Sequence, residues 1–429
     1  MSTNLFNPSD CRNYSPRWPL YRGKQLFHVI DERSQEGTEE LLSVSHITGI
    51  TPRSQKNVTM FQAESLAGYK LCQVGDVVAN TMWTWQGAIG VSNYMGVVSP
   101  SYNVYRPNRD IYQPRFLDML LREKSLIDVY HSLSTGIRPS RLRLYPEVFL
   151  TICFPVPPRD EQNQIVKFLD WKISSISKLL CVKKEQLTTV QELISRQYQL
   201  ISSNAMQNAK LKYVTSLCDD FIEIDPAEHY TKTGMYNRGR GIFRREAMLG
   251  EDMGDSLFQK IHSGCVMISG QFAWEAATYV TTEEDEVGVA SHRYYLLAPK
   301  KEVPAEYIWC FLMSDYGQMH MKLCSHGAAG RNRPLNIKEL LNAYIPIPQP
   351  DSKLNALVQN VQSLIKLRKN VLLQEHVLIE MRNRLISDVV TGKIDVRGIE
   401  IPEYEFMEEP DLAEESDEQD YEDYTEGEE

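Results

Sequence analysis

The sequence contains no run of 18 apolar residues and no apolar core near its N-terminus. Neither a membrane-spanning helix nor a secretory signal peptide is therefore expected. The eight cysteines lie far apart, with no C-x-x-C pair and no Cys/His cluster. Zinc sites and disulfide frameworks need such spacing, so we interpret the cysteines as reduced thiols of a cytoplasmic protein.

Motifs of several catalytic classes are also missing. There is no G-x-x-x-x-G-K-[ST] loop for ATP, no G-x-S-x-G elbow, and no N-P-P-[FY] or D-P-P-[FY] motif of the kind that adenine methyltransferases carry. The acidic run at 283–286 lacks the spaced E-x-K partner of a restriction nuclease. The histidines are scattered, and we interpret His28, His46 and His292 as surface or core residues. We therefore predict that the chain is non-catalytic and binds neither a metal nor a cofactor.

Positive charge is missing from the C-terminal end. Residues 401–429 hold 15 acidic residues and no lysine or arginine, which accounts for the net charge of −11. The rest of the chain has 46 basic and 42 acidic residues and is mildly basic, which permits an anionic partner without proving one. The acidic stretch has too little apolar surface to fold, so we expect residues 394–429 to form a disordered tail.

An internal repeat of roughly 190 residues is the main feature that is present. "FPVPPRDEQNQIVKFLD" at 154–170 has the same character as "IPIPQPDSKLNALVQNV" at 345–361. Five matches keep their order at a nearly constant offset: Pro155 and Pro157 with Pro346 and Pro348; Gly75 and Trp85 with Gly264 and Trp274; "SPSY" at 99–102 with "SHRY" at 291–294; "GIRPSRLRLYPEVFLTICFPVP" with "GAAGRNRPLNIKELLNAYIPIP"; and "RQYQLISSNA" with "RNRLISDVVTG". Matches in this order are unlikely to arise by chance, so the chain consists of two related halves.

Each half is predicted to be a globular segment followed by a long helix. The globular segments are residues 1–157 and 207–349, where short β-branched runs separated by Gly, Asn and Pro predict strands mixed with short helices. The helices occupy 158–206 and 350–393. Asp160 and Asp351 are predicted N-caps, and Gly392 is a predicted stop. The fold class is therefore α+β.

Both helices carry a narrow apolar stripe at spacings of three and four, interrupted at Lys183/Lys184 in the first and at Arg368, Glu375 and Arg382 in the second. Such a stripe is typical of a coiled-coil seam. The helices are similar in length, roughly 65 Å for the first, so we expect them to pair with each other in antiparallel orientation. The predicted seam residues are Ile165, Leu169, Ile173, Ile176, Leu180, Leu187, Val190, Ile194, Val358, Val361, Ile365, Leu372, Ile379 and Ile386.

This pairing would relate the two globular segments by a pseudo-two-fold axis. Two-fold proteins read paired half-sites on duplex DNA. The segments diverge outside their shared framework, since "HVIDERSQEGTEELLSVSHITGITPRSQKN" has no close match in the second half. We therefore expect two different half-sites, with the helices acting as a ruler that sets their separation.

With these features the chain resembles the specificity subunit of type I restriction–modification enzymes, over nearly everything before the acidic tail. The first helix begins with P-x-P-P…E-Q-x-x-I-x-x-F-L-D, and "LISDVVTGKIDVR" at 385–397 is similar to the end of the family's second helix. The residues of the first motif are Pro155, Pro157, Pro158, Glu161, Gln162, Ile165, Phe168, Leu169 and Asp170. The second boundary departs from the motif at Ser352 and Lys353, and the family does not predict the acidic tail.

The resemblance implies two target-recognition domains that read an asymmetric bipartite site on double-stranded DNA. It also implies partner chains, namely two methylation subunits and two restriction/translocase subunits of a phage-defence system. S-adenosylmethionine, ATP and Mg²⁺ are expected on those partners. No membrane is involved.

Arginine and lysine contribute affinity through phosphates and, with polar side chains, specificity through base edges. Clusters of basic residues predict the DNA contacts, and "NRGRG" at 237–241 is the strongest of them because glycine permits close backbone approach. The candidates are Arg53, Lys56, Arg106, Arg109, Arg138, Arg141, Arg143, Arg238, Arg240, Arg244, Arg245, Arg331 and Arg333. The matched Trp85 and Trp274 are interpreted as core packing, since base flipping belongs to the partner that modifies the base.

Two alternatives stay open at this point. The chain could be a two-lobed coiled-coil scaffold that binds proteins and reads no DNA. It could also serve a methylation-only or other non-cleaving system, because the nuclease and motor lie on other chains. The acidic tail is either a solubilising appendage or an electrostatic competitor for a DNA groove.

Overall fold

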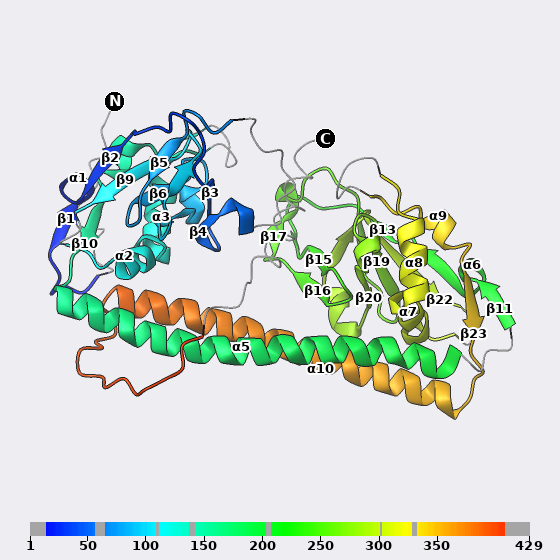
Figure 1. The fold of residues 1–429 in the computed structure, drawn as a ribbon. Coiled ribbons are helices and arrows are strands. Elements are labelled where there is room, and N and C mark those ends of the chain that lie inside the picture. The colour runs from blue at the N-terminus through cyan, green and yellow to red at the C-terminus, as the bar shows by residue number, and fades with distance from the viewer. Residues whose placement is uncertain are drawn as a thin grey trace. The chain divides into compact units, whose positions relative to one another are not determined.

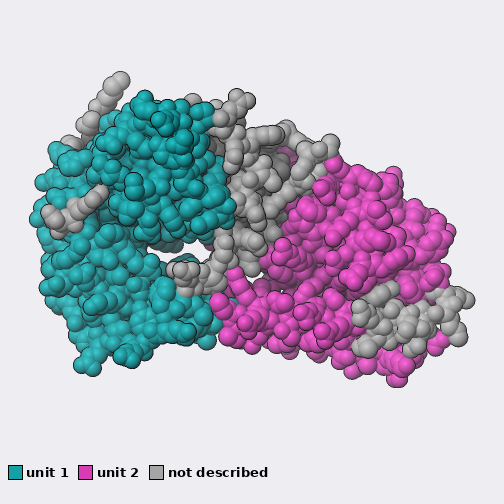
Figure 2. Space-filling view, viewed as in Figure 1, with its two compact units in different colours: residues 1–180, 377–417 teal, residues 181–376, 418–429 magenta. Residues whose placement is uncertain are grey.

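The computed structural model describes residues 14–55, 65–108, 111–136, 142–202, 207–300, 303–327 and 333–407. It divides into two compact units (Figure 2). Unit 1 comprises Met1–Leu180 and Val377–Asp417, and unit 2 comprises Cys181–His376 and Glu418–Glu429. Each unit therefore combines one globular segment with parts of both long helices.

Unit 1 is built on a four-stranded antiparallel sheet of order β2-β9-β6-β7 (Figure 1). Its strands are β2 (Phe27–Ile30), β9 (Asn103–Pro107), β6 (Val77–Ala79) and β7 (Ile89–Val91). Three further pairs are β1 (Leu20–Arg22) with β10 (Cys153–Pro155), β3 (Leu42–Ser45) with β4 (Gly49–Pro52), and β5 (Lys70–Cys72) with β8 (Gly96–Val98). The short helices are α1 (Gly23–Leu26), α2 (Pro114–Leu121), α3 (Lys124–Leu133), α4 (Pro146–Phe149), η2 (Arg53–Gln55) and η3 (Thr84–Gln86).

Helix α2 illustrates how the core of unit 1 forms. Pro114 at its first position is pre-set for a helix, and the Gln113 side chain caps it by accepting a hydrogen bond from the Phe116 N–H. Phe116, Leu117, Leu120 and Leu121 share one face and are fully buried in the core that also holds Phe27, Tyr105 and Phe149. The apolar face of α2 therefore packs on the sheet at β7.

Unit 2 repeats this arrangement with a four-stranded antiparallel sheet of order β12-β22-β19-β20. Its strands are β12 (Thr215–Cys218), β22 (Tyr294–Pro299), β19 (Val266–Ser269) and β20 (Thr278–Val280). The remaining strands pair as β11 (Gln207–Lys210) with β23 (Tyr344–Ile347), β15 (Thr233–Tyr236) with β16 (Gly241–Arg244), β14 (His229–Tyr230) with β17 (Met248–Leu249), and β18 (Phe258–Lys260) between β13 (Phe221–Ile222) and β21 (Val289–Ser291). The helices are α6 (Leu211–Val214), α7 (Ala305–Met313), α8 (Asp315–Leu323), α9 (Ile337–Leu340), η5 (Gly250–Asp252), η6 (Ala273–Glu275) and η7 (Glu283–Val287).

The two units follow the same topology, so the internal repeat is confirmed as a structural one. The equivalent sheets connect their strands in the same order, and helices α2 and α3 correspond to α7 and α8. A buried tyrosine marks the same place in both: the Tyr112 hydroxyl donates to the Pro155 carbonyl at 2.8 Å, and the Tyr307 hydroxyl donates to the Pro346 carbonyl at 2.9 Å. These bonds hold the first proline of each bracket against its globular core.

Two long helices follow the globular segments, α5 (Arg159–Ser202) and α10 (Ser352–Val390). Asp351 is the N-cap of α10 as predicted, since its Oδ1 accepts from the N–H groups of Lys353 and Leu354, both at 2.9 Å. Asp160 is not a cap, because α5 already begins at Arg159; it lies in the first turn, where its charge suits the helix dipole. Gly392 ends α10 with φ +74°, a conformation that disfavours side chains.

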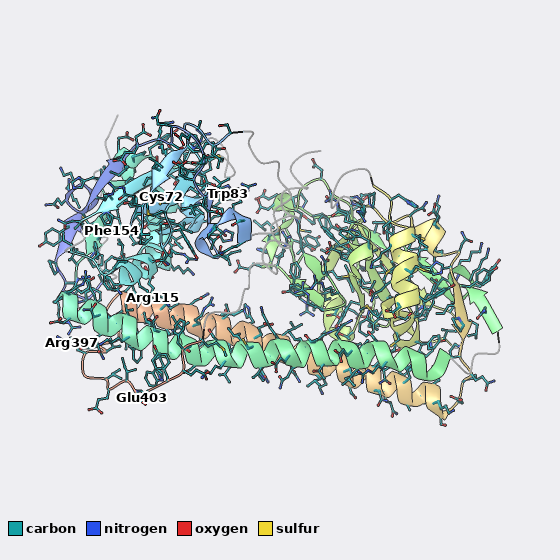
Figure 3. All side chains as sticks on the ribbon, in the orientation of Figure 1. Cys72, Trp83, Arg115, Phe154, Arg397 and Glu403 are labelled. Atoms are coloured by element: carbon teal, nitrogen blue, oxygen red, sulfur yellow. The ribbon has the colours of Figure 1, made fainter. Side chains whose placement is uncertain are left out.

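The start of α5 is anchored by a fully buried glutamine. Gln162 Nε2 donates to the carbonyls of Ile111 at 2.9 Å and Pro157 at 2.8 Å, while its Oε1 accepts from the Gln113 N–H at 2.8 Å. Further along, Arg115 Nε lies 2.6 Å from Asp170 Oδ1; Figure 3 labels Arg115. The corresponding position at the start of α10 is the exposed Lys353, so the departure from the family motif removes this anchor from unit 2.

The apolar stripes are buried within each unit. In unit 1, Ile165, Leu169 and Ile173 of α5 share a hydrophobic cluster with Val389 and Val390 of α10, and Ile386 packs against it. In unit 2, Val190 and Ile194 share one with Val361 and Ile365, and Val358 packs against it. Ile176 and Leu180 are also buried, whereas Leu187, Leu372 and Ile379 are half-buried. Arg368 and Glu375, which interrupt the stripe in the sequence, are themselves buried.

Residues 394–407 differ from the predicted disordered tail, because they lie along α5. Gln164 Nε2 donates to the carbonyls of Val396 and Ile399, and the Ser174 hydroxyl donates to Glu405 O at 3.1 Å and accepts from Met407 N at 2.7 Å. Val396 is buried in the core of unit 1. Side chains of α5 thus form hydrogen bonds with backbone groups of this segment. Figure 3 labels Arg397 and Glu403 in the segment. The rest of the predicted tail, 408–429, lies outside the described residues.

Candidate nucleic-acid interface

The structure describes eight of the thirteen predicted DNA contacts. Arg53 is half-buried on η2, Arg143 is exposed beside α4, and Arg333 is exposed before α9. Arg238, Arg240, Arg244 and Arg245 lie on or beside the hairpin of β15 and β16, and Arg106 lies in β9. Lys56, Arg109, Arg138, Arg141 and Arg331 lie outside the described residues.

Arg106 is engaged in an ion pair inside unit 1. Its Nε and Nη2 donate to the two carboxylate oxygens of Asp76 at 2.8 and 2.9 Å, and Asp76 is fully buried. Asp76 also accepts from the Gln73 N–H at 2.9 Å. The hydrogen bond to Asp76 raises the pKa of Arg106. This bidentate pair uses the Nε–Nη2 edge of the guanidinium and neutralises its charge, so we assign Arg106 to the fold.

The "NRGRG" stretch forms a tight turn between β15 and β16. Arg238 and Gly239 both have positive φ, at 59° and 64°. Their N–H groups donate to the carbonyls of Glu275 and Ala276, both at 2.8 Å, and the Asn237 side chain donates to Glu275. The turn is therefore fastened to the end of η6, and the Arg238 side chain is exposed. Arg240 lies over the ring of Tyr236, 5.3 Å from its centre.

Helix α10 fastens the same turn from another side. The buried Arg368 donates to Gly239 O and lies 5.2 Å from the ring centre of Trp309. Burial lowers the pKa of Arg368 to about 10, so the side chain is still charged at neutral pH. Its neighbour Lys369 donates to Thr282 Oγ1 at 3.0 Å and to Glu284 Oε2 at 3.3 Å. Two consecutive cations of α10 therefore hold the loops of unit 2.

Adjacent arginines of the hairpin have different surroundings. Arg244 Nη2 lies 3.3 Å from Oδ1 of the buried Asp285 and also donates to Glu284 O, while Lys369 lies 3.5 Å from the same carboxylate. Arg245, the next residue, lines a cavity with Lys232 and Arg293. Lys232 and Arg293 were not among the predicted contacts. Only the alignment of "SHRY" with "SPSY" pointed to the segment that holds Arg293.

Trp85 and Trp274 are half-buried, so they are less enclosed than the core-packing interpretation predicted. Each lies on a one-turn 3₁₀ helix, η3 or η6, between two sheet strands. Trp85 stacks on Trp83 with ring centres 6.2 Å apart. Trp274 instead carries Arg333 over its ring, 5.1 Å from the centre, in a cation–π contact.

The described residues include no group of three or more His, Cys, Asp or Glu side chains that could hold a metal ion. Cys72, Cys153, Cys181, Cys218, Cys265, Cys310 and Cys324 are free thiols. Burial raises the pKa of Cys72 to about 11. A search of the described helices finds none long and apolar enough to cross a membrane.

No protein-family model and no curated protein matches this sequence. Among solved structures, a chain from work on complex assembly and conformational transition of the type I R-M (restriction–modification) system is similar, with a TM-score of 0.53 at 16% identity, covering 89% of this chain and 99% of that one. The HsdS subunit from Thermoanaerobacter tengcongensis matches with a TM-score of 0.38 at 15% identity, covering 89% and 98%. The type I restriction–modification S subunit from M. genitalium matches with a TM-score of 0.41 at 11% identity, covering 88% and 96%. The chain therefore shares its fold, over 89% of its length, with a chain of a type I restriction–modification system.

Proposed function

We propose that this chain is the DNA-recognition subunit of a type I restriction–modification complex. It reads an asymmetric bipartite site and positions the subunits that modify and cleave DNA. The observation that carries the proposal is the repeat of one topology in two units whose basic surfaces differ, in a chain with a fold found in such systems. A repeated framework with different surfaces suits two different half-sites.

The globular segments 1–157 and 207–349 act as the two target-recognition domains in this proposal. The helices at 158–206 and 350–393 pair as an antiparallel coiled coil and relate the domains by a pseudo-two-fold axis. Support comes from the cores: the first half of α5 shares a cluster with the end of α10 in unit 1, and the second half of α5 shares one with the start of α10 in unit 2. The paired helices then set the spacing between half-sites.

Base and phosphate contacts come from cations for which the described residues show no acidic partner. Arg238 on its anchored turn and Arg333 above Trp274 are the first candidates in the second domain, and Arg53 and Arg143 in the first. Lys56, Arg109, Arg138, Arg141 and Arg331 remain candidates. Arg244 joins Arg106 among the structural residues, since Asp285 holds it.

The chemistry lies on other chains. Two methylation subunits with S-adenosylmethionine and two restriction/translocase subunits with ATP and Mg²⁺ would complete the complex, and this chain supplies recognition without catalysis. The proposal places the complex in the cytoplasm, where its DNA target is found.

Mapping of modified adenines tests the proposal. The chain is co-expressed with its methylation subunit in a host without adenine methylation, and modified bases are located by single-molecule sequencing. One asymmetric bipartite motif is expected, and replacing the globular segment of one unit should change one half of it. An assembled complex with an active methylation subunit that modifies no motif would overturn the proposal and favour a protein-binding scaffold.

A further inference from the structure

Helix α8 of unit 2 carries an exposed apolar stripe. Tyr316, Met319 and Leu323 are 46%, 46% and 60% exposed. Their spacing of three and four residues places them on one face of the helix. Single exposed apolar side chains are common on protein surfaces, whereas a contiguous apolar face is a feature of interaction sites.

Unit 1 does not carry this stripe. Helix α3 is the equivalent of α8, since the Glu123 side chain caps its first turn as the Ser314 side chain caps that of α8. The buried Tyr130 of α3 stands where α8 buries Met321. At the same offset, the positions of the stripe are polar in unit 1, namely Ser125, Asp128 and Ser132. The shared framework therefore does not require apolar side chains there.

Two charged residues lie along one edge of the stripe. Each residue of an α-helix turns by about 100°, which places Asp315 and Lys322 on one edge, Tyr316 and Leu323 on the other, and Met319 between them. Asp315 and Lys322 are exposed, and within the described part of the chain neither forms an ion pair. Both line an open hollow of about 390 Å³ together with Met319 and Leu323. The face therefore combines apolar side chains with one acid and one base.

This face is complementary to itself. If two copies of α8 pack antiparallel about a two-fold axis at Met319, each edge meets the same edge of the other copy in reverse order. Asp315 of one copy then lies opposite Lys322 of the other, and this pair occurs twice. Tyr316 likewise lies opposite Leu323 of the other copy. Antiparallel helix dipoles add to the attraction.

We propose that α8 is a self-association surface, to which a second copy of this chain binds in an antiparallel, two-fold arrangement. Helix α3 of unit 1 offers no such face, since Lys124 and His131 stand in place of Asp315 and Lys322. Two helical turns bury less than the roughly 800 Å² per partner of a standard interface, so the dimer should be weak and form at high protein concentration.

The pairing needs neither DNA nor another subunit. On the proposed function, it would bring two DNA-recognition complexes together, and only this consequence rests on that function.

Sedimentation velocity of the full chain, from low micromolar to several hundred micromolar, tests the surface. Wild type should shift from monomer to dimer as the concentration rises. The variant Tyr316→Ser/Met319→Asp/Leu323→Ser takes the residues of α3 and should stay monomeric, while thermal unfolding checks that it folds. The control Leu257→Ser changes an exposed apolar residue outside α8 and should dimerise as wild type does.

Charge reversal tests the arrangement. Asp315→Lys and Lys322→Asp each place like charges opposite each other at two symmetric positions, so each should weaken self-association about tenfold. An equimolar mixture of the two variants should recover the wild-type affinity, because every facing pair is then one acid and one base. A purely structural role in α8 would give no such recovery.

Three results would overturn the proposal. A wild-type chain that stays monomeric throughout the range would show that α8 is not a self-association surface. A triple variant that still dimerises would assign the contact to another surface, and a mixture as weak as its components would refute the antiparallel pairing. A monomeric wild type whose triple variant no longer assembles with the methylation subunit would assign the stripe to that partner.

Discussion

Units 1 and 2 share a topology but use different residues to maintain it. In unit 1 the buried Asp76 binds Arg106 across the sheet, whereas the matching position after the shared glycine in unit 2 is the buried Cys265. In unit 2, Lys232 and Arg293 line a cavity, whereas the equivalent positions of unit 1 are Leu41 and Ser101. The common framework tolerates a change of polarity at equivalent positions, which lets one fold present two recognition surfaces.

Removing the buried ion pair should give the largest effect. Asp76→Ala leaves Arg106 without its partner and should destabilise unit 1 by about 3 kcal/mol, because the remaining charge is partly desolvated. Cys265→Ala at the equivalent site of unit 2 removes one sulfur atom and should cost about 1 kcal/mol. Chemical denaturation with unit-resolved hydrogen exchange measures both. Equal losses in the free energy of unfolding would mean that the two positions contribute equally to the stability of their units.

Breaking the contact between α10 and the "NRGRG" turn should affect recognition more than stability. Arg368→Met keeps the volume and removes a buried charge, so stability should change by less than about 1 kcal/mol. The turn loses its bond to Gly239 O, and affinity for the second half-site should fall about tenfold, within the usual range for one base contact.

Arg368→Lys is the matched control, since it keeps a donor near Gly239 O. Binding to duplexes with substitutions in either half-site measures the effect. A loss confined to the first half-site would contradict this role of Arg368.

In the part of the chain that the structure describes, the docked segment 394–407 follows α10, whereas the next element described after α5 is β11. Ser174→Ala removes two hydrogen bonds to this segment. The free energy needed to open the segment should therefore fall by about 1 kcal/mol. Hydrogen exchange at residues 400–407 measures this change. Ser175→Ala, which removes only a bond to Trp171 O of the same helix, is the control and should leave exchange in the segment unchanged.

Acid should release this segment, with the smallest effect of the series. Hydrogen bonds from Arg397, then from Arg17, hold the pKa of Asp395 well below its usual range. A carboxyl with a depressed folded pKa contributes stability above its unfolded pKa, near 4, and loses it as the pH falls further. Exchange in residues 394–400 should therefore speed up below about pH 4 in wild type. Asp395→Asn should remove this step, and a step that persists would assign it to another group.

Much of the architecture follows from local sequence pattern. The proline brackets, the aligned Gly75 and Gly264, and the stripes of α5 and α10 predicted two repeated units with long helices, and the strand order confirms the repeat. Asp351 and Gly392 marked the ends of α10 correctly. Such features involve residues a few positions apart, whose backbone preferences and periodicity are readable without knowledge of the fold.

The candidate site depended on contacts between distant residues. Whether an arginine is neutralised was decided by Asp76, 30 residues from Arg106, and by Asp285, 41 residues from Arg244. The bond from Arg368 to Gly239 spans 129 positions. Composition also misjudged residues 394–407, because side chains of α5 satisfy their backbone. The sequence by itself determined the repeat, the long helices and the positions of the basic residues along the chain. The tertiary structure decided which of these basic residues form ion pairs with acidic side chains and which line a cavity, because Coulomb attraction and hydrogen bonding depend on distance in space.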